Sequence, residues 1–478
     1  MQVGPSTATA RPAVPHPQLQ RRTLSRPVRA VAAKLAPLRV SLSGIRLPLF
    51  LLIIITISRV HQNFPILAKV RPALLLFAWA LAMLVFGDKR SLALGNVREL
   101  PSRLILWLGA AAMLSVPFGI SIGGSASYFL NAYSKTLILA LMVAVAIRNA
   151  DDLWTMVWAY VIAVGILALM TMTVFRMGPA SASGFSRLGD GYTYDANDIG
   201  LVCVTGLPLC LATFRTSRTF GKAASLMILA MSCVAIARTG SRGAFLGILS
   251  IAAGLLLMAR GTGVGKRLVI AVIGAGALAI AAPQGYLSQM STITNPTDDY
   301  NWTSQTGRKE VAKRGFGYLM RNPVTGIGLW NFPRAEGTLS EAAQAFEEGG
   351  AGVKWSTTHN SYLQALVEMG IIGGVLFAAL IIVGIGFGRT VRRMTGARPT
   401  LHGSGQLLVT NVAEYLPIAF IGFAVTCFFL SFAYMDVVYL LAAMAAAGLG
   451  LARRGDVQPA TRQPRLRTGV NRQRPVSA

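Results

Sequence analysis

The chain has 478 residues, of which 53% are apolar and only 13% are charged. Soluble domains carry about 25% charged residues, so this composition excludes an ordinary water-soluble globule. The mean hydropathy of +0.54 agrees. A formal net charge of +27 would suggest nucleic-acid binding on a soluble chain. Here the basic residues gather between apolar stretches, which favours a membrane protein and no nucleic-acid partner.

About twelve apolar stretches are candidate transmembrane helices, because a spanning helix needs about 20 mostly apolar residues. The sequence therefore predicts an all-α, polytopic integral membrane protein with about 12 transmembrane helices. Residues 47–283 would hold the first nine helices and 359–452 the last three, with a large loop containing short helices at 284–358. In chain order the stretches lie near 47–58, 72–87, 104–120, 128–147, 153–175, 198–214, 223–237, 243–259, 268–283, 360–388, 411–431 and 434–452.

The basic residues indicate how the chain is oriented in the membrane. With both termini inside, the cytoplasmic segments hold about twice as many Lys and Arg residues as the outer ones. The outer loop with Arg59, Lys69 and Arg71 is the local exception. The basic segments 1–46 and 453–478 are expected to be disordered cytoplasmic tails near anionic lipid. For 1–46 a transit peptide stays an alternative, whereas a cleaved signal peptide is not expected.

The four cysteines all lie inside apolar stretches. They are too far from any histidine for a zinc site and form no disulfide framework, so they are expected to be small buried apolar residues. They are Cys203, Cys210, Cys233 and Cys427.

The outer segment from Asp190 to Asp198 is rich in polar and aromatic groups at the entrance of an apolar stretch. Asn197 and Asp198 are candidates for substrate binding, because such groups can recognise a sugar. An ordinary turn in an interfacial aromatic belt is the alternative. No metal site is expected here, since oxygen clusters of this kind are common in loops.

A very short outer turn, with Arg238 on one side and Arg242 on the other, links two apolar stretches. An arginine so close to hydrocarbon is costly and is often functional. Two guanidinium groups in one turn can hold a diphosphate, because they bind phosphate oxygens in a bidentate manner. The alternative is that both side chains reach up to lipid headgroups.

The large loop contains one clear helical pattern. Thr306 can cap a helix from Gly307 to Met320, and Asn322-Pro323 would end it. The helix carries basic residues, including Arg308, beside apolar ones, and it fits a helix lying on the outer leaflet. The following glycine-rich stretch contains Trp330, which is either a substrate-binding residue or an aromatic-belt anchor.

The last long apolar stretch is preceded by Thr357-Thr358-His359-Asn360-Ser361. We expect the threonines to cap the helix, which would place His359 at or near its first turn. A helix N-terminus disfavours a cation, and a neutral imidazole suits a general base. Helical spacing would bring Gly370 and Gly373 within about 40° of His359 and place Glu368 on the opposite face. An interfacial polar residue without a catalytic role is the alternative.

Several of these motifs together resemble the O-antigen ligase / O-antigen polymerase family. The stretch His359-Asn360-Ser361-Tyr362-Leu363, followed by Glu368, Gly370 and Gly373, looks like the family signature. The resemblance covers about 190–375 and the helix layout. The other matching motifs are Asp195-Ala196-Asn197-Asp198, Ser241-Arg242-Gly243-Ala244 and Gly307-Arg308 leading to Gly326-Ile327-Gly328.

The resemblance implies a glycosyltransferase of the bacterial inner membrane that inverts the anomeric centre without a metal or other cofactor. Its partners would be an undecaprenyl-diphosphate-linked glycan donor, an acceptor hydroxyl on a glycan, lipid or protein, and membrane lipids. His359 would take the acceptor proton, and Arg242 and Arg308 would hold the diphosphate, with Arg238 added from its position. Asn197, Asp198, Asn360 and Trp330 would bind substrate.

Two other classes of function remain open. A transporter of an inorganic anion or of the lipid-linked glycan would place charged groups near the membrane midplane. Lys135, Glu414 and Asp436 are the main charged residues in or beside apolar stretches, and the sequence has no inverted repeat. A structural membrane subunit is the third possibility. The sequence does not indicate the oligomeric state or the acceptor.

Overall fold

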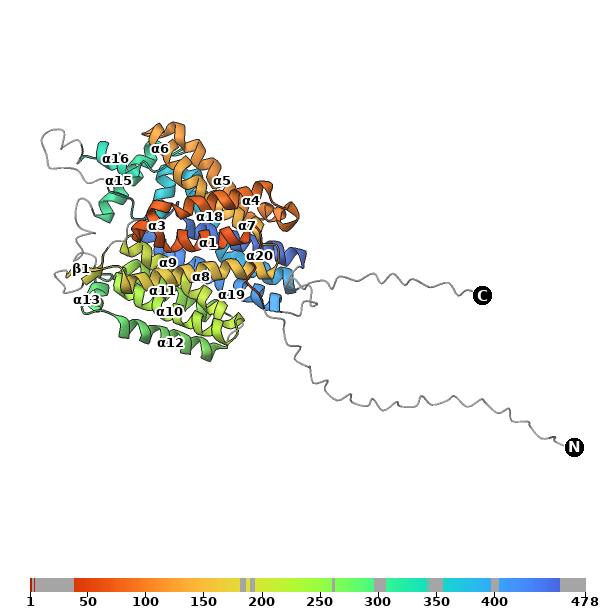
Figure 1. Ribbon diagram of the computed structural model, residues 1–478. Coiled ribbons are helices and arrows are strands. Elements are labelled where there is room, and N and C mark those ends of the chain that lie inside the picture. The colour runs from red at the N-terminus through yellow and green to blue at the C-terminus, as the bar shows by residue number, and fades with distance from the viewer. Residues whose placement is uncertain are drawn as a thin grey trace. The chain divides into compact units, whose positions relative to one another are not determined.

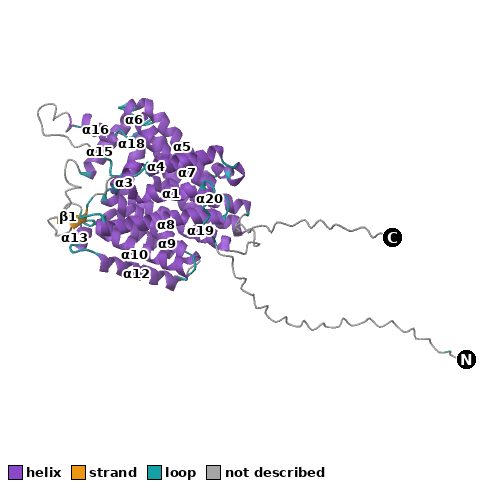
Figure 2. Ribbon diagram, viewed as in Figure 1, coloured by secondary structure: helices purple, strands orange, loops and turns teal. Residues whose placement is uncertain are grey.

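A computed structural model describes residues 38–180, 186–189, 194–259, 263–295, 307–341, 356–396 and 404–455, with the isolated residues Met1, Gly4 and Ala343. The chain divides into two units, Met1–Leu35 and Ala36–Ala478, and every described helix and strand lies in the second. Residues 5–37 and 456–478 of the predicted tails lie outside the described residues. The described part 38–46 bonds to the rest of the fold, since the Arg39 N–H donates to Asp151 at 3.0 Å and the Ser41 N–H to Thr155 at 2.7 Å. Within the described part the fold is nearly all helical (Figures 1 and 2).

Every apolar stretch expected from the sequence overlaps a helix. The helices are α1 (Arg46–Ser58), α2 (Val60–Asn63), α3 (Pro65–Val70), α4 (Pro72–Phe86), α5 (Leu100–Ser115), α6 (Ile122–Tyr128), the π-helix η4 (Phe129–Tyr133), α7 (Ser134–Ala146), α8 (Ala150–Thr173), α9 (Ala196–Thr216), α10 (Thr219–Thr239), α11 (Arg242–Met258) and α12 (Val264–Ala281). They continue with α13 (Tyr286–Ser291), α15 (Arg308–Arg321), α16 (Phe332–Thr338), α18 (Ser361–Gly396), α19 (Ser404–Thr426), the 3₁₀ helix η6 (Cys427–Phe429) and α20 (Asp436–Arg454).

Eight helical segments in the described part of the chain are long and apolar enough to cross a membrane. Three more apolar helices, α1, α4 and α11, are shorter. The protein is therefore a polytopic all-α membrane protein, and the count of 12 transmembrane helices stays a prediction.

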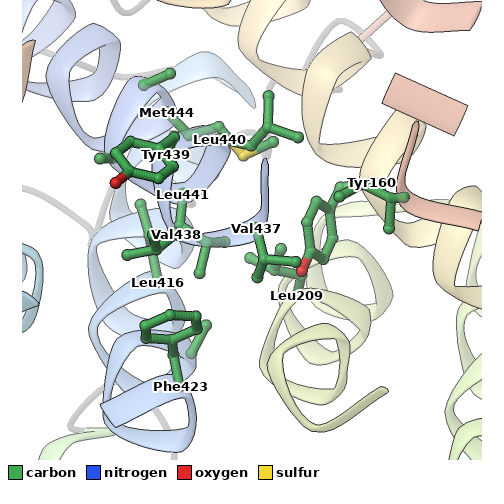
Figure 3. Close-up of a cluster of buried hydrophobic side chains, with 14 of the residues drawn as sticks. Tyr160, Leu209, Leu416, Phe423, Val437, Val438, Tyr439, Leu440, Leu441 and Met444 are labelled. Carbon is green, nitrogen blue, oxygen red and sulfur yellow. The ribbon is translucent and has the colours of Figure 1, made fainter. Parts of the chain in front are cut away.

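The core lies where α8, α9, α19 and α20 meet (Figure 3). Tyr160 of α8 and Leu209 of α9 face Phe423 of α19 and the first half of α20, and these side chains are fully buried. The Tyr160 hydroxyl shares a 2.8 Å hydrogen bond with Thr205 of α9, so the polar atom is satisfied inside the apolar core. The four cysteines are buried and carry free thiols, as expected.

Charged groups beside the apolar helices form ion pairs. Arg215 donates to Glu414 at 2.9 Å, and Arg59 lies 3.2 Å from the carboxylate of Asp436. The carboxylates that the transporter alternative invoked therefore neutralise arginines within the fold. Such pairing is how a low-dielectric region tolerates charge.

The α18 helix is broken at Gly370, whose backbone has φ +69° and ψ −172°. The expectation that Gly370 and Gly373 continue one helical face from His359 is therefore wrong. The break arises because the backbone of residues 323–328 crosses α18 at this point. A Cβ at residue 370 would lie 2.0 Å from the Val324 carbonyl oxygen, which only glycine avoids.

The described part of the large loop contains the short helices α13, α15 and α16, as predicted, and Figure 1 shows them at the same end of the helices as the small sheet. That sheet pairs β1 (Met177–Ala180) with β2 (Ser186–Leu188) in antiparallel fashion and was not expected. We call this end of the molecule the loop end.

The predicted loop helix is α15, beginning at Arg308 and ending at Arg321, and Thr306 lies outside the described residues. Its apolar face packs against protein: Val311 and Tyr318 are buried with Phe332 of α16 and Leu363 of α18. Neighbouring helices thus cover part of the apolar face, whereas Phe316 and Met320 are exposed, so the placement of the helix on the outer leaflet stays a prediction. Arg314 holds the buried Glu336 of α16 through Nε at 2.9 Å, and this bond raises the pKa of the guanidinium.

Candidate active site

The first turn of α18 is capped by Asn360 and not by the threonines. The Asn360 side-chain oxygen accepts the backbone N–H groups of Tyr362 at 2.9 Å and Leu363 at 3.0 Å. Asparagine is among the best N-cap residues because its oxygen reaches these otherwise unpaired donors. His359 therefore precedes the helix, where it adopts a left-handed backbone with φ +48°. It therefore lies near the first turn, as expected, and only the expected threonine cap is wrong.

The segment between α19 and α20 fixes the histidine. We call residues 430–435 the connector. The His359 N–H donates to the Ser431 hydroxyl at 2.9 Å, and the same hydroxyl shares a 2.8 Å hydrogen bond with Thr358. Ser361 donates to the Leu430 carbonyl at 2.7 Å and accepts the Phe432 N–H at 2.9 Å. The start of α18 and the connector are thus joined by several hydrogen bonds.

Sequence reasoning missed the connector. Ser431-Phe432-Ala433-Tyr434 lies between two apolar stretches, and three of these four residues are themselves apolar or aromatic. The only local signal was the serine, whose hydroxyl can bond to a neighbouring backbone.

Glu368 faces the loop. Its carboxylate accepts the N–H of Trp330 at 2.9 Å and the N–H of Phe332 at 3.0 Å, and the side chain is fully buried. These bonds direct the carboxylate to the loop backbone, and its expected place on the face opposite His359 stays a prediction. The adjacent backbone adds two more bonds, because Ile327 donates to the Val367 carbonyl at 2.9 Å and Gly328 to that of Glu368 at 3.1 Å.

Trp330 lies on the surface of this loop segment. Its ring stacks on Tyr128 with centroids 4.5 Å apart and planes 3° from parallel, and 38% of the residue is exposed. The neighbouring Asn331 donates to the Ser125 hydroxyl at 2.9 Å, which ties the loop to α6. Tyr128 therefore covers one face of the Trp330 ring and holds the ring in place, and part of the residue stays exposed.

Arg242 is the first residue of α11, after the N-cap Ser241, and donates to the Thr292 hydroxyl at 2.8 Å. The next residue, Gly243, lies so close to Phe429 of η6 that an added Cβ would be 2.9 Å from its Cβ. The start of α11 thus reaches the residues just before the connector. Arg238 stands in the last turn of α10, and its Nε is buried without a hydrogen-bond partner among the described residues.

Arg308 is the first residue of α15. One turn later Val311 is buried in the cluster with Leu363, and an added Cβ at Gly315 would be 3.2 Å from that leucine. Leu363 lies in the first turn after His359. Arg308 therefore belongs to an element that packs on the histidine's helix.

Asn197 and Asp198 lie in the first turn of α9, where Asp198 completes a capping box with Asp195. Asp195 accepts the N–H groups of Asn197 at 2.7 Å and Asp198 at 2.9 Å, and Asp198 accepts the N–H of Asp195 at 3.1 Å. The carboxylates thus stabilise a helix start. Tyr194, just before the box, packs 6.0 Å from the ring of Phe432 in the connector.

The connector region is where the predicted residues come together. It bonds to His359 through Ser431 and reaches the start of α9 through Phe432, and Phe429 just before it contacts the start of α11. Trp330 and Arg308 are connected to the same region through the first part of α18. The Trp330 N–H bonds to Glu368, and the helix that begins at Arg308 packs on Leu363. Burial and the carboxylate of Glu368 hold the pKa of Tyr434 well above its ordinary value, so its hydroxyl stays protonated.

A large apolar cavity of about 1430 Å³ lies between α9, α10, α11, α12 and α13. At the loop end it is lined by Phe245, one turn after Arg242, and by Tyr286 of α13, whose rings lie 6.4 Å apart. Burial raises the pKa of Tyr286 to about 12. The cavity could hold a long hydrocarbon chain with its polar end near Arg242.

Comparison with known families assigns a domain to this region. Residues 226–378, about a third of the chain, match the family model Wzy_C, described as O-antigen ligase. The match includes Arg238, Arg242, Arg308, Trp330 and His359, so the resemblance seen in the sequence is confirmed over this range. No curated protein matches the chain.

Proposed function

Starting from an O-antigen ligase domain at residues 226–378 in a polytopic membrane protein, we propose that the chain transfers or polymerises a glycan from undecaprenyl diphosphate. The acceptor is a hydroxyl at the periplasmic face of the bacterial inner membrane, and both termini are cytoplasmic. The observation that carries the proposal is the convergence of His359 and the start of α11 on residues 429–431.

His359 acts as the general base. It stands half-buried just outside a helix N-terminus, and the helix dipole there disfavours the imidazolium. The neutral imidazole takes the acceptor proton as the hydroxyl oxygen attacks the anomeric carbon, and the diphosphate leaves from the opposite face. This single displacement inverts the anomeric centre. A positioned base contributes about 10²–10⁴-fold.

Arg242 binds the diphosphate, with Arg238 beside it across the tight turn and Arg308 at the start of α15. Diphosphate is already a competent leaving group, so the protein mainly neutralises its developing charge. Guanidinium groups suit this task because they bind phosphate oxygens in a bidentate manner. No metal or cofactor is required.

The polyprenyl chain of the donor occupies the apolar cavity between α9 and α13. Support comes from its volume of about 1430 Å³, its apolar lining and the place of Phe245 one turn after Arg242. A chain lying there keeps its diphosphate near the arginines.

The sugar groups contact Trp330, Asn360 and Asn197. The exposed face of Trp330 offers an apolar surface, and the Asn360 amide nitrogen can donate because its oxygen is used by the helix cap. Asp198 takes part mainly by fixing the start of α9.

The test is transfer by the full chain in proteoliposomes loaded with an undecaprenyl-diphosphate-linked glycan. We expect His359→Ala to lower transfer by 10²-fold or more while the protein stays inserted and folded. Arg393→Ala at the other end of α18 is the control. Wild-type transfer by His359→Ala would remove the catalytic assignment, and a product that retains the donor's anomeric configuration would exclude single displacement.

The glycans that accumulate in a deletion strain distinguish the variants of this function. Single repeat units would indicate a polymerase, and long unattached chains would indicate a ligase. Normal glycans together with altered ion uptake would favour a transporter instead.

A further inference from the structure

A second cavity lies at the loop end, away from the start of α11. It has a volume of about 660 Å³ and lies between α1, α2, α3, α4 and α7. Its polar lining includes Arg59, His61, Arg71, Lys135, Thr136 and Asp436. The basic loop 59–71, the exception to the expected charge distribution, is the segment that forms one wall.

One of the cations in the cavity is already compensated. Arg59 adopts a left-handed backbone with φ +54° and lies 3.2 Å from Asp436, whose other oxygen accepts the Thr136 hydroxyl at 2.7 Å. The guanidinium also lies 5.4 Å from the centre of the Tyr194 ring. Burial disfavours its charge, but Tyr194 and Asp436 outweigh this and raise the pKa of Arg59. Arg59 and Asp436 therefore form an ion pair without net charge in the wall of the cavity.

Two other cations, Arg71 and Lys135, line the same cavity. Arg71, which also has a left-handed backbone with φ +49°, and Lys135 line the cavity without a carboxylate within 4.0 Å in the described part of the chain. Their positive charge is available to an anion, and a phosphate group suits a guanidinium and an ammonium together.

The rim of the cavity is apolar. The helices α3 and α4 line the cavity with Ala68 and Leu74, and beside these residues they expose Ile66, Val70 and Leu75, with Ile66 at 79%. Exposed apolar side chains on a membrane protein face acyl chains. A ligand that fills the cationic cavity and covers this rim must carry a phosphate and hydrocarbon chains on one molecule.

We propose that this cavity binds the phosphate headgroup of an anionic lipid, with its acyl chains along α3 and α4. Arg71 and Lys135 contact the phosphate, and the Arg59–Asp436 ion pair lines the wall beside them. The site does not depend on the function proposed above, because neither Arg71 nor Lys135 belongs to the candidate active site.

The experiment measures lipid bound to the full chain in detergent by native mass spectrometry, with phosphatidylglycerol and phosphatidylcholine as probes. We expect retention of phosphatidylglycerol over phosphatidylcholine by wild type, and a loss of at least fivefold in the double variant Arg71→Gln/Lys135→Gln. Lys69→Gln is the matched control, since Lys69 lies on α3 but does not line the cavity. The melting temperature without lipid checks that each variant is folded.

Equal retention of phosphatidylglycerol by wild type and the double variant would overturn the proposal. A loss of the same size in Lys69→Gln would do so too, because general surface charge would then explain binding. In a third arm, inorganic phosphate at equal concentration is added as a competitor. Full displacement of the lipid would show a site for soluble anions and not for a lipid.

Discussion

The backbone N–H of His359 donates to the hydroxyl of Ser431 at 2.9 Å, although 72 positions separate the two residues. The bond holds His359 in a left-handed backbone conformation that costs a non-glycine residue about 1–3 kcal/mol. Ser431 is therefore a positioning residue for the proposed base.

Replacing Ser431 by alanine removes the acceptor of this bond. We expect kcat for glycan transfer to fall roughly tenfold to hundredfold, because a displacement of about 1 Å costs that much, while KM for the donor changes little. Ser431→Thr keeps a hydroxyl and should restore most of the rate. Equal rates for Ser431→Ala and wild type would mean that His359 is held by other contacts.

Arg242 should distinguish a bidentate phosphate contact from simple charge. We expect Arg242→Ala to reduce kcat/KM for the donor about 10–100-fold, because a charge-assisted hydrogen bond contributes about 1.5–3 kcal/mol. Arg242→Lys keeps the charge and should fall between this variant and wild type. Steady-state rates at varied donor concentration measure the effect. Wild-type rates for both variants would show that the guanidinium does not hold phosphate.

Gly370 and Gly386 lie in the same helix but differ in backbone and surroundings. Gly370→Ala forces a Cβ against the Val324 carbonyl at a backbone conformation almost restricted to glycine, so we expect a lower melting temperature and weaker docking of the loop. Gly386→Ala meets nothing within 4 Å and should stabilise the helix by about 0.5–1 kcal/mol. Thermal unfolding in detergent compares them, and similar midpoints would contradict the role of the break.

The lipid cavity should respond to pH through His61. Burial and the nearby Arg59 lower the pKa of His61 from its ordinary value of 6.5, so the imidazole is neutral at pH 7. The other charged groups that line the cavity are Arg59, Arg71, Lys135 and Asp436. Below pH 6.5 the lipid-free protein should lose stability, because the unfolded chain binds the proton more readily.

A bound phosphate opposes this effect. Protonation of His61 adds a cation beside the anion, so retention of phosphatidylglycerol should increase between pH 7 and pH 5.5. His61→Gln should remove the increase, as native mass spectrometry at both pH values can measure. A rise of equal size in His61→Gln would assign the pH dependence to another group.

The helices could be predicted from the sequence because apolar length is a local property. The helix α15 was found from its pattern and its Asn322-Pro323 end, but the pattern could not show that α16 and α18 cover part of its apolar face. The break in α18 was not predictable, since Gly370 looks like any helical glycine until the Val324 carbonyl lies against it.

The candidate site was partly predictable for the same reason. His359 and Arg242 could be chosen by residue type and neighbourhood, and both lie at the loop end. The residue types before α18 predicted a cap but led to the wrong residue. Asn360 caps the helix, whereas the Thr358 hydroxyl bonds to Ser431. The capping box of Asp195 and Asp198 was readable from their spacing of three.

The stacking of Trp330 on Tyr128 has a consequence for the proposed glycan contact. Tyr128 covers one ring face at 4.5 Å, so the proposed sugar unit would lie against the other face. A surface that is open on one side would contact one unit without enclosing its neighbours along the polymer. Such a contact would set no upper limit on the size of the saccharide.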